Sequence, residues 1–159
     1  MAATIIEAVF IVLIAISLIA IAFPFAVNTI RKTTDLSEST TVRNELEICN
    51  DKILETARTG VGNRCIFSVD KGTLIVDDDW IRYTIISQAD ICDQSDFTLL
   101  DEEKNIWQGC TVNDDIRTYQ LGWFSNSIRF DVQGLSGKIL EFSRKELFPD
   151  YALLSMKVS

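Results

Sequence analysis

The stretch AVFIVLIAISLIAIAFPFAVNTI, residues 8–30, decides the fold of this chain of 159 residues. It contains no charged side chain and no glycine. As an α-helix, these 23 residues would extend about 34 Å, which is enough to cross the hydrocarbon core of a bilayer. The stretch therefore predicts an apolar helix that spans a membrane. Pro24 is expected to kink or loosen this helix, because proline lacks a backbone donor.

A polar stretch, residues 33–41 (TTDLSESTT), follows the apolar one and holds six Ser or Thr residues. It fits a flexible joint, an O-glycosylated patch or a polar helix surface. Asp35 or Ser37 is a candidate cap for a new helix, since both residue types accept hydrogen bonds from free backbone N–H groups.

Beyond this stretch, apolar residues recur at spacings of three and four, which predicts an amphipathic helix. Gly60 and Gly62 are expected to end it. The simplest model is one long helix, hydrophobic over residues 1–32 and amphipathic over residues 33–60. The apolar stripe consists of Val42, Leu46, Cys49, Ile53 and Ala57.

From residue 61 onward the apolar period changes to two, and all seven glycines lie at or beyond Gly60. Residues 61–159 therefore predict an antiparallel, β-rich domain that packs on the amphipathic helix, so the fold class is α+β. Residues 88–109 are polar and acidic and predict a long loop. The strands are expected at 65–69, 73–76 and 80–87, forming a three-strand meander, and then at 116–121, 128–132, 138–142 and 154–158.

Four cysteines are present, and none of them lies in a C-x-x-C pair, which disfavours a zinc or thioredoxin-type site. We expect disulfides between Cys49 and Cys65 and between Cys92 and Cys110, because each pair closes a short loop; four buried free thiols are the alternative. Disulfides would place the β-rich domain outside the cytoplasm. Arg31 and Lys32 by themselves would favour the opposite orientation, and a basic leader ahead of Met1 would remove this conflict.

The composition argues against an enzyme and against a nucleic-acid-binding protein. The formal net charge is −8, so the chain lacks the basic surface that phosphate contacts need. Histidine is absent, and no nucleophile elbow, P-loop or dinucleotide-binding motif occurs. The acidic run at residues 77–79 is interpreted as a hairpin turn rather than a calcium site. No catalytic residue, metal ligand or cofactor is therefore predicted.

Glu7 is the only ionisable side chain among the first 30 residues. A carboxylate at the edge of an apolar helix is costly in lipid and is expected to pair with a cation. Either it lies at the bilayer surface among headgroups, or it pairs with the free α-amino group of a neighbouring chain. The second reading would make Glu7 an assembly residue.

These features resemble type IV pilins, and more narrowly an archaeal pilin-like filament subunit. Thr4-Ile5-Ile6-Glu7 is similar to the opening of many pilins, and Pro24 follows Glu7 by 17 residues, as in bacterial members. In pilins this glutamate is the fifth mature residue, so the resemblance would make Ala3 the first mature residue. The resemblance implies a lollipop-shaped subunit, with Glu7 setting the register of packed helices.

The resemblance further implies a major pilin that polymerises through its N-terminal helix into an extracellular filament for adhesion. The precursor would wait in the cytoplasmic membrane, where a prepilin peptidase and an assembly ATPase with its platform would be its partners. The alternatives are an archaellum subunit, a pseudopilin or minor pilin of a secretion or DNA-uptake machine, and a single-span, membrane-anchored binding module.

Overall fold

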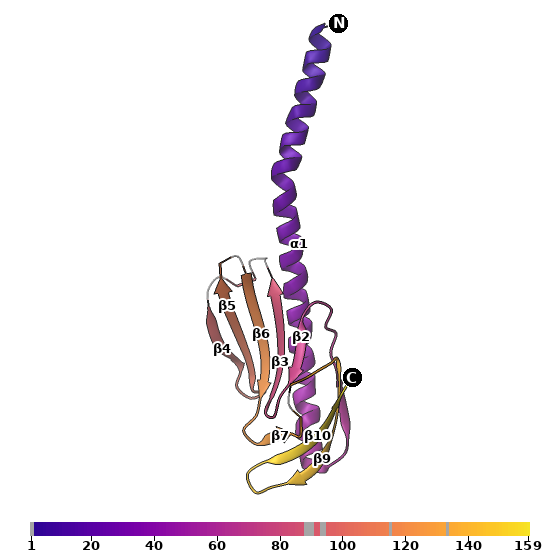
Figure 1. The fold of residues 1–159 in the computed structure, drawn as a ribbon, viewed down its shortest axis with the longest axis vertical. Helices are drawn as coiled ribbons and strands as arrows, with labels where there is room; N and C mark the ends of the chain where they lie inside the picture. Colours follow the sequence, from indigo (N-terminus) through magenta and orange to yellow (C-terminus); the bar gives the residue numbers. More distant parts are fainter. Residues whose placement is uncertain (1, 88–90, 93–94, 115, 133) are drawn as a thin grey trace.

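The computed structural model describes the backbone of residues 2–87, 91–92, 95–114, 116–132 and 134–159, and the side chains in these ranges from residue 8 onward. One long helix, α1 (Ala2–Thr59), carries a β-rich domain at its C-terminal half, while its N-terminal half projects alone (Figure 1). The α+β layout expected from the sequence is confirmed. Asp35 and Ser37 do not cap a second helix, because both lie inside α1.

In the described part of the chain, ten strands form two sheets. The four-stranded sheet has the order β1-β9-β10-β7 and the six-stranded sheet the order β4-β5-β6-β3-β2-β8. Neighbouring strands are antiparallel except for β10 and β7, which are parallel. The strands are β1 (Asn63–Ile66), β2 (Thr73–Val76), β3 (Trp80–Ser87), β4 (Asp96–Asp101), β5 (Ile106–Asn113), β6 (Ile116–Phe124), β7 (Ile128–Phe130), β8 (Leu135–Ser136), β9 (Ile139–Leu147) and β10 (Ala152–Val158).

The apolar stripe of α1 faces the core as its spacing predicted. Its first four members are at most 1% exposed, and Ala57 packs at the margin of the same cluster. Because this stripe needs a partner surface, the sheets cover it with their inward-facing alternate residues. The helix ends at Thr59, where Gly60 adopts a φ of 80° and donates its N–H to the Thr56 carbonyl at 2.8 Å. This left-handed conformation suits glycine, which has no Cβ.

The predicted three-strand meander is wrong. Of the three strands expected in the meander, β2 and β3 pair as a hairpin, whereas β1 pairs with β9, with Cys65 opposite Leu140. Alternation along the chain indicates which face of a strand is buried but not which strand lies beside it. Here β1 follows α1 directly and is bonded to it through Cys65, so it lies in the four-stranded sheet.

The predicted loop at residues 88–109 is also wrong in its second half. Residues 96–101 and 106–113 form the β4–β5 hairpin, while residues 88–90 and 93–94 lie outside the described part of the chain. The strand β4 lies at the sheet edge and half of it is exposed, so it lacks the apolar alternation on which the prediction relied. The residue type of Asn105 could have indicated a turn, because asparagine tolerates the left-handed conformation. In the structure Asn105 lies between the two strands with a φ of 54°.

Candidate functional site

The apolar half of α1 is not covered by the β domain. From residue 8 to residue 34 no side chain is buried, and Phe25 is 74% exposed. The most apolar 18 residues have a mean hydropathy of 2.9, so by length and composition this helix is suited to cross a membrane. Large contiguous apolar surfaces on a folded protein mark contact with lipid or with other chains. This projecting segment, residues 8–30, is the candidate functional surface.

The two hydroxyl side chains within the projecting segment are bonded to the helix itself. The hydroxyl of Ser17 donates to the Leu13 carbonyl at 2.8 Å, and the hydroxyl of Thr29 donates to the Phe25 carbonyl at 2.8 Å. Such bonds to the carbonyl four residues earlier leave neither hydroxyl donor unsatisfied in an apolar medium. The segment can therefore lie against lipid or against another apolar helix without exposing these donors.

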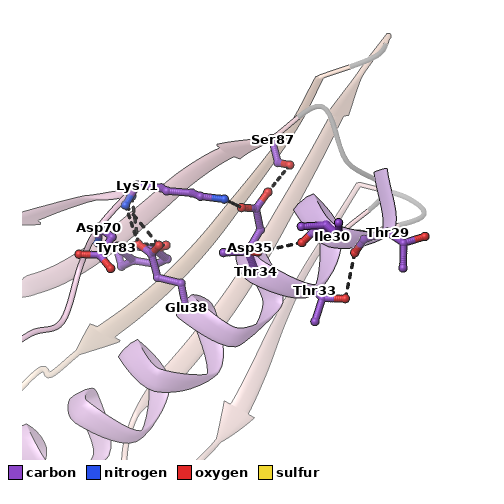
Figure 2. Close-up of polar contacts among 11 residues, drawn as sticks. Thr29, Ile30, Thr33, Thr34, Asp35, Glu38, Asp70, Lys71, Tyr83 and Ser87 are labelled. Carbon is purple, nitrogen blue, oxygen red and sulfur yellow. Dashed lines mark hydrogen bonds and ion pairs between the residues drawn. The ribbon is translucent and has the colours of Figure 1, made fainter. Parts of the chain in front are cut away.

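A polar junction begins where the exposed segment ends. Asp35 is 6% exposed and accepts two hydrogen bonds, from Lys71 Nζ at 2.7 Å and from the Ser87 hydroxyl at 2.5 Å. Figure 2 shows Lys71 reaching Asp35 from the turn before β2, and Ser87 from the end of β3. A buried carboxylate needs such partners, because desolvation without them is costly.

Glu38, one turn further along α1, holds the turn before β2. Its carboxylate accepts the backbone N–H groups of Asp70, Lys71 and Gly72 at 3.1 Å each. It also accepts the Tyr83 hydroxyl at 3.0 Å (Figure 2). Three consecutive N–H groups that converge on one carboxylate form an anion-binding turn occupied by the protein's own side chain.

The electrostatics of the junction follow from these bonds. Burial would raise the pKa of Glu38, but the N–H groups of Lys71 and Gly72, together with the Tyr83 hydroxyl, outweigh it and lower this pKa below its ordinary value of 4.5. Burial, and then the neighbouring Glu38 carboxylate, raise the pKa of Tyr83. At neutral pH the junction thus contains an ionised acceptor and a protonated donor.

The two disulfides are present, with Cys49 bonded to Cys65 and Cys92 bonded to Cys110. These are the pairs favoured by the loop lengths. The first bond joins α1 to β1 inside the core, where both cysteines are at most 3% exposed. The second joins the segment after β3 to β5. The helix is therefore held to the β domain at two positions, by the junction at Asp35 and Glu38 and by the disulfide at Cys49.

The residues singled out from the sequence are not brought together into one site. Glu7 lies in α1, but its side chain is outside the described residues. Pro24 lies inside α1, which continues through it as a helix, and is exposed. The acidic turn is engaged by the protein, since Asp77 accepts the Gly134 N–H and Asp78 pairs with Arg129.

Sequence reasoning missed the junction residues Asp35 and Glu38. Both are charged residues within a Ser/Thr-rich stretch, and their partners lie 32 to 52 positions away. The only local signal was the pair of acidic residues three positions apart, which places them on one face of a helix.

The arrangement presents an uncharged helical surface at a fixed position relative to a disulfide-linked β domain. That geometry is compatible with the shape of a pilin-like subunit and suits anchoring or helix packing. Comparisons with protein-family models, with curated proteins and with solved structures find no match to this chain.

Proposed function

We propose that this chain is the structural subunit, a major pilin, of an extracellular type IV pilus-like filament that serves in adhesion. The observation that carries the proposal is the projecting segment, residues 8–30, which is uncharged and has no buried side chain. Such a surface requires an apolar environment, either the membrane before assembly or the helices of identical subunits afterwards.

The continuity of α1 favours a filament over a simple anchor. A membrane anchor functions with any linker between span and domain, whereas helical packing of subunits requires each domain to hold a defined position relative to its helix. In this chain the span enters the β domain without a break, and Asp35 and Glu38 bind the domain one turn after the exposed segment ends. A regular polymer would need this unbroken connection between the projecting segment and the β domain, because it gives every subunit the same geometry.

Helix packing in place of lipid contact yields little net hydrophobic gain, so polar pairing is needed to set register. In this proposal Glu7 pairs with the α-amino group of a neighbouring subunit. The β domains would then form the outer surface of the filament, stabilised by their two disulfides.

Electron microscopy of material sheared from cells that produce this chain tests the proposal. Thin filaments whose mass spectrum contains this chain are the expected result, and their peptides would also define the mature N-terminus. Recovery of the chain only as detergent-extracted monomers would contradict the proposal and favour a single-span, anchored binding module.

The pairing role of Glu7 has its own test. Glu7→Ala should abolish filaments or disturb their helical order, while Glu103→Gln, which removes one exposed carboxylate from the β4–β5 turn, should leave them intact. Normal filaments from Glu7→Ala would disprove the pairing without affecting the filament assignment.

A further inference from the structure

The outer face of the six-stranded sheet carries an aromatic cleft that the filament proposal does not use. Along β3, Ile81, Tyr83 and Ile85 point into the core, so Trp80 and Arg82 lie on the opposite face. A cavity of about 380 Å³ opens on this face, within the size range of small-ligand sites. Its lining includes Asp77, Trp80, Arg82, Phe97, Trp107 and Gln120.

Strand register explains why the cleft is hollow. Gly122 on β6 lies between Trp107 on β5 and Arg82 on β3, and Gly109 on β5 lies between Phe97 on β4 and Gln120 on β6. The two glycines supply no side chain, so they form the floor between larger neighbours.

Aromatic rings lie close over this floor. A Cβ placed on Gly109 would come within 2.9 Å of the Phe97 ring, and one on Gly122 within 3.3 Å of the Trp80 ring. Phe97 and Trp107 stack with ring centroids 5.3 Å apart and an interplanar angle of 18°. Phe97 is 56% exposed, and Trp80 and Trp107 are partly exposed, so part of each ring surface remains open to the cleft.

Planar polar groups border these rings. Arg82 Nη2 lies 3.5 Å from Asp77 Oδ2, and both side chains are more than one third exposed, so each retains hydrogen-bonding capacity. The side-chain amide of Gln120 makes no hydrogen bond within the part of the chain that the structure describes. The cleft thus combines apolar ring surfaces with hydrogen-bond donors and acceptors. The positive charge of Arg82 offsets the negative charge of Asp77.

We propose that this cleft binds a neutral pyranose oligosaccharide. A pyranose ring presents C–H bonds on its faces, which pack on the electron-rich faces of aromatic rings. Its equatorial hydroxyls accept from guanidinium and amide groups and donate to carboxylates. The net charge of −8 disfavours uronic, sulfated and other anionic sugars.

Other ligand classes fit this cleft less well. A peptide cannot add as a strand over the floor of the cleft, because β5, β6 and β3 are each paired on both sides. A quaternary ammonium ion would gain no net charge attraction, because Arg82 offsets Asp77. A nucleic acid would be opposed by the net charge of the chain.

The test uses the full chain in a detergent without a sugar headgroup, since a maltoside would compete for the cleft. Cellohexaose, maltohexaose and mannohexaose are each titrated to about 10 mM, and saturation-transfer NMR and tryptophan fluorescence report binding. At least one of the three neutral hexaoses should bind. Binding of none, or tighter binding of a galacturonate hexamer, would overturn the proposal.

Variants locate the site. Trp80→Ala should weaken the binding at least about ten-fold by removing a stacking face. Arg82→Ala should weaken it about ten-fold, and it leaves the fold intact because the ion pair to Asp77 is exposed. Arg64→Ala, on β1 in the other sheet, removes the same charge and should leave affinity unchanged. Equal affinity in wild type, Trp80→Ala and Arg82→Ala would overturn the site. None of these measurements requires filaments, so the result is independent of the filament proposal.

Discussion

The hydroxyl of Tyr83 donates a 3.0 Å hydrogen bond to the carboxylate of Glu38, joining the six-stranded sheet to α1 just beyond the exposed segment of the helix. Tyr83 is completely buried. The same carboxylate oxygen accepts backbone N–H groups from the turn before β2. One side chain thus connects the helix, the turn and the sheet, and it is the point at which the junction can be tested.

Glu38→Gln should destabilise the β domain by about 2 kcal/mol. The amide oxygen can take the place of Oε1, which accepts four donors, but it carries no charge to strengthen those bonds, and the NH2 group would face the Lys71 N–H that Oε2 accepts at 3.2 Å. Urea unfolding of the full chain in detergent, followed by tryptophan fluorescence, measures the change. Glu103→Gln, exposed in the β4–β5 turn, is the matched control and should be neutral. Equal unfolding midpoints for the two variants would contradict the structural role of Glu38.

Acid should weaken the fold through two carboxylates. Hydrogen bonding lowers the folded-state pKa of Glu38 despite its burial, and the hydrogen bond from Lys104 lowers that of Glu47. Because a lowered pKa favours the ionised form in the folded state, this stability is present above the ordinary value of 4.5 and is lost as pH falls through the folded-state pKa.

Thermal unfolding between about pH 7 and pH 3 measures this loss. The Tm should decline once the pH falls below about 4.5, and Glu38→Gln should reduce the decline. A Tm that stays constant over the whole range, or an equal decline in the variant, would contradict the assignment.

Gly72→Ala should destabilise the domain by about 3 kcal/mol. An added Cβ would overlap the ring of Tyr83, which is fully buried and cannot move aside without breaking its bond to Glu38. Gly62→Ala is the control, because its Cβ would meet its nearest atom at an ordinary 3.5 Å. Thermal unfolding of both variants distinguishes the two positions, and equal Tm values would contradict the close approach.

Removing the core disulfide with Cys49→Ala and Cys65→Ala should cost about 3 kcal/mol, as expected for closing a short loop. Hydrogen exchange should then show reduced protection in β1, because the bond holds this strand to α1. The corresponding removal of Cys92–Cys110 should leave β1 protected, since that bond joins a different part of the fold. Unchanged protection of β1 in the first variant would contradict this role.

Some of the fold could be predicted because the signal is local. The apolar stripe from Val42 to Ile53 repeats within a few residues, and the helix stop at Gly60 depends on one backbone conformation. The uncharged segment, residues 8–30, defines its own length and the environment it needs. Short loops favoured the two cysteine pairs that the structure contains.

The partners of β1 and Glu38 could not be predicted in this way. Whether β1 pairs with β2 or with β9 depends on where the helix and the disulfide place it, and Leu140 lies far along the chain from Cys65. The aromatic cleft likewise depends on Trp107 and Arg82 reaching one glycine from two different strands.

The amino-acid sequence by itself determined that this protein has an apolar helix in need of an apolar environment, followed by an amphipathic helix and a β-rich domain. These properties follow from side chains that are neighbours along one element. Only the tertiary structure decided how Asp35 and Glu38 hold the helix to the sheet and where the cleft opens. Those contacts join residues that are distant in the chain, and they form only when the packed core fixes the register of the strands.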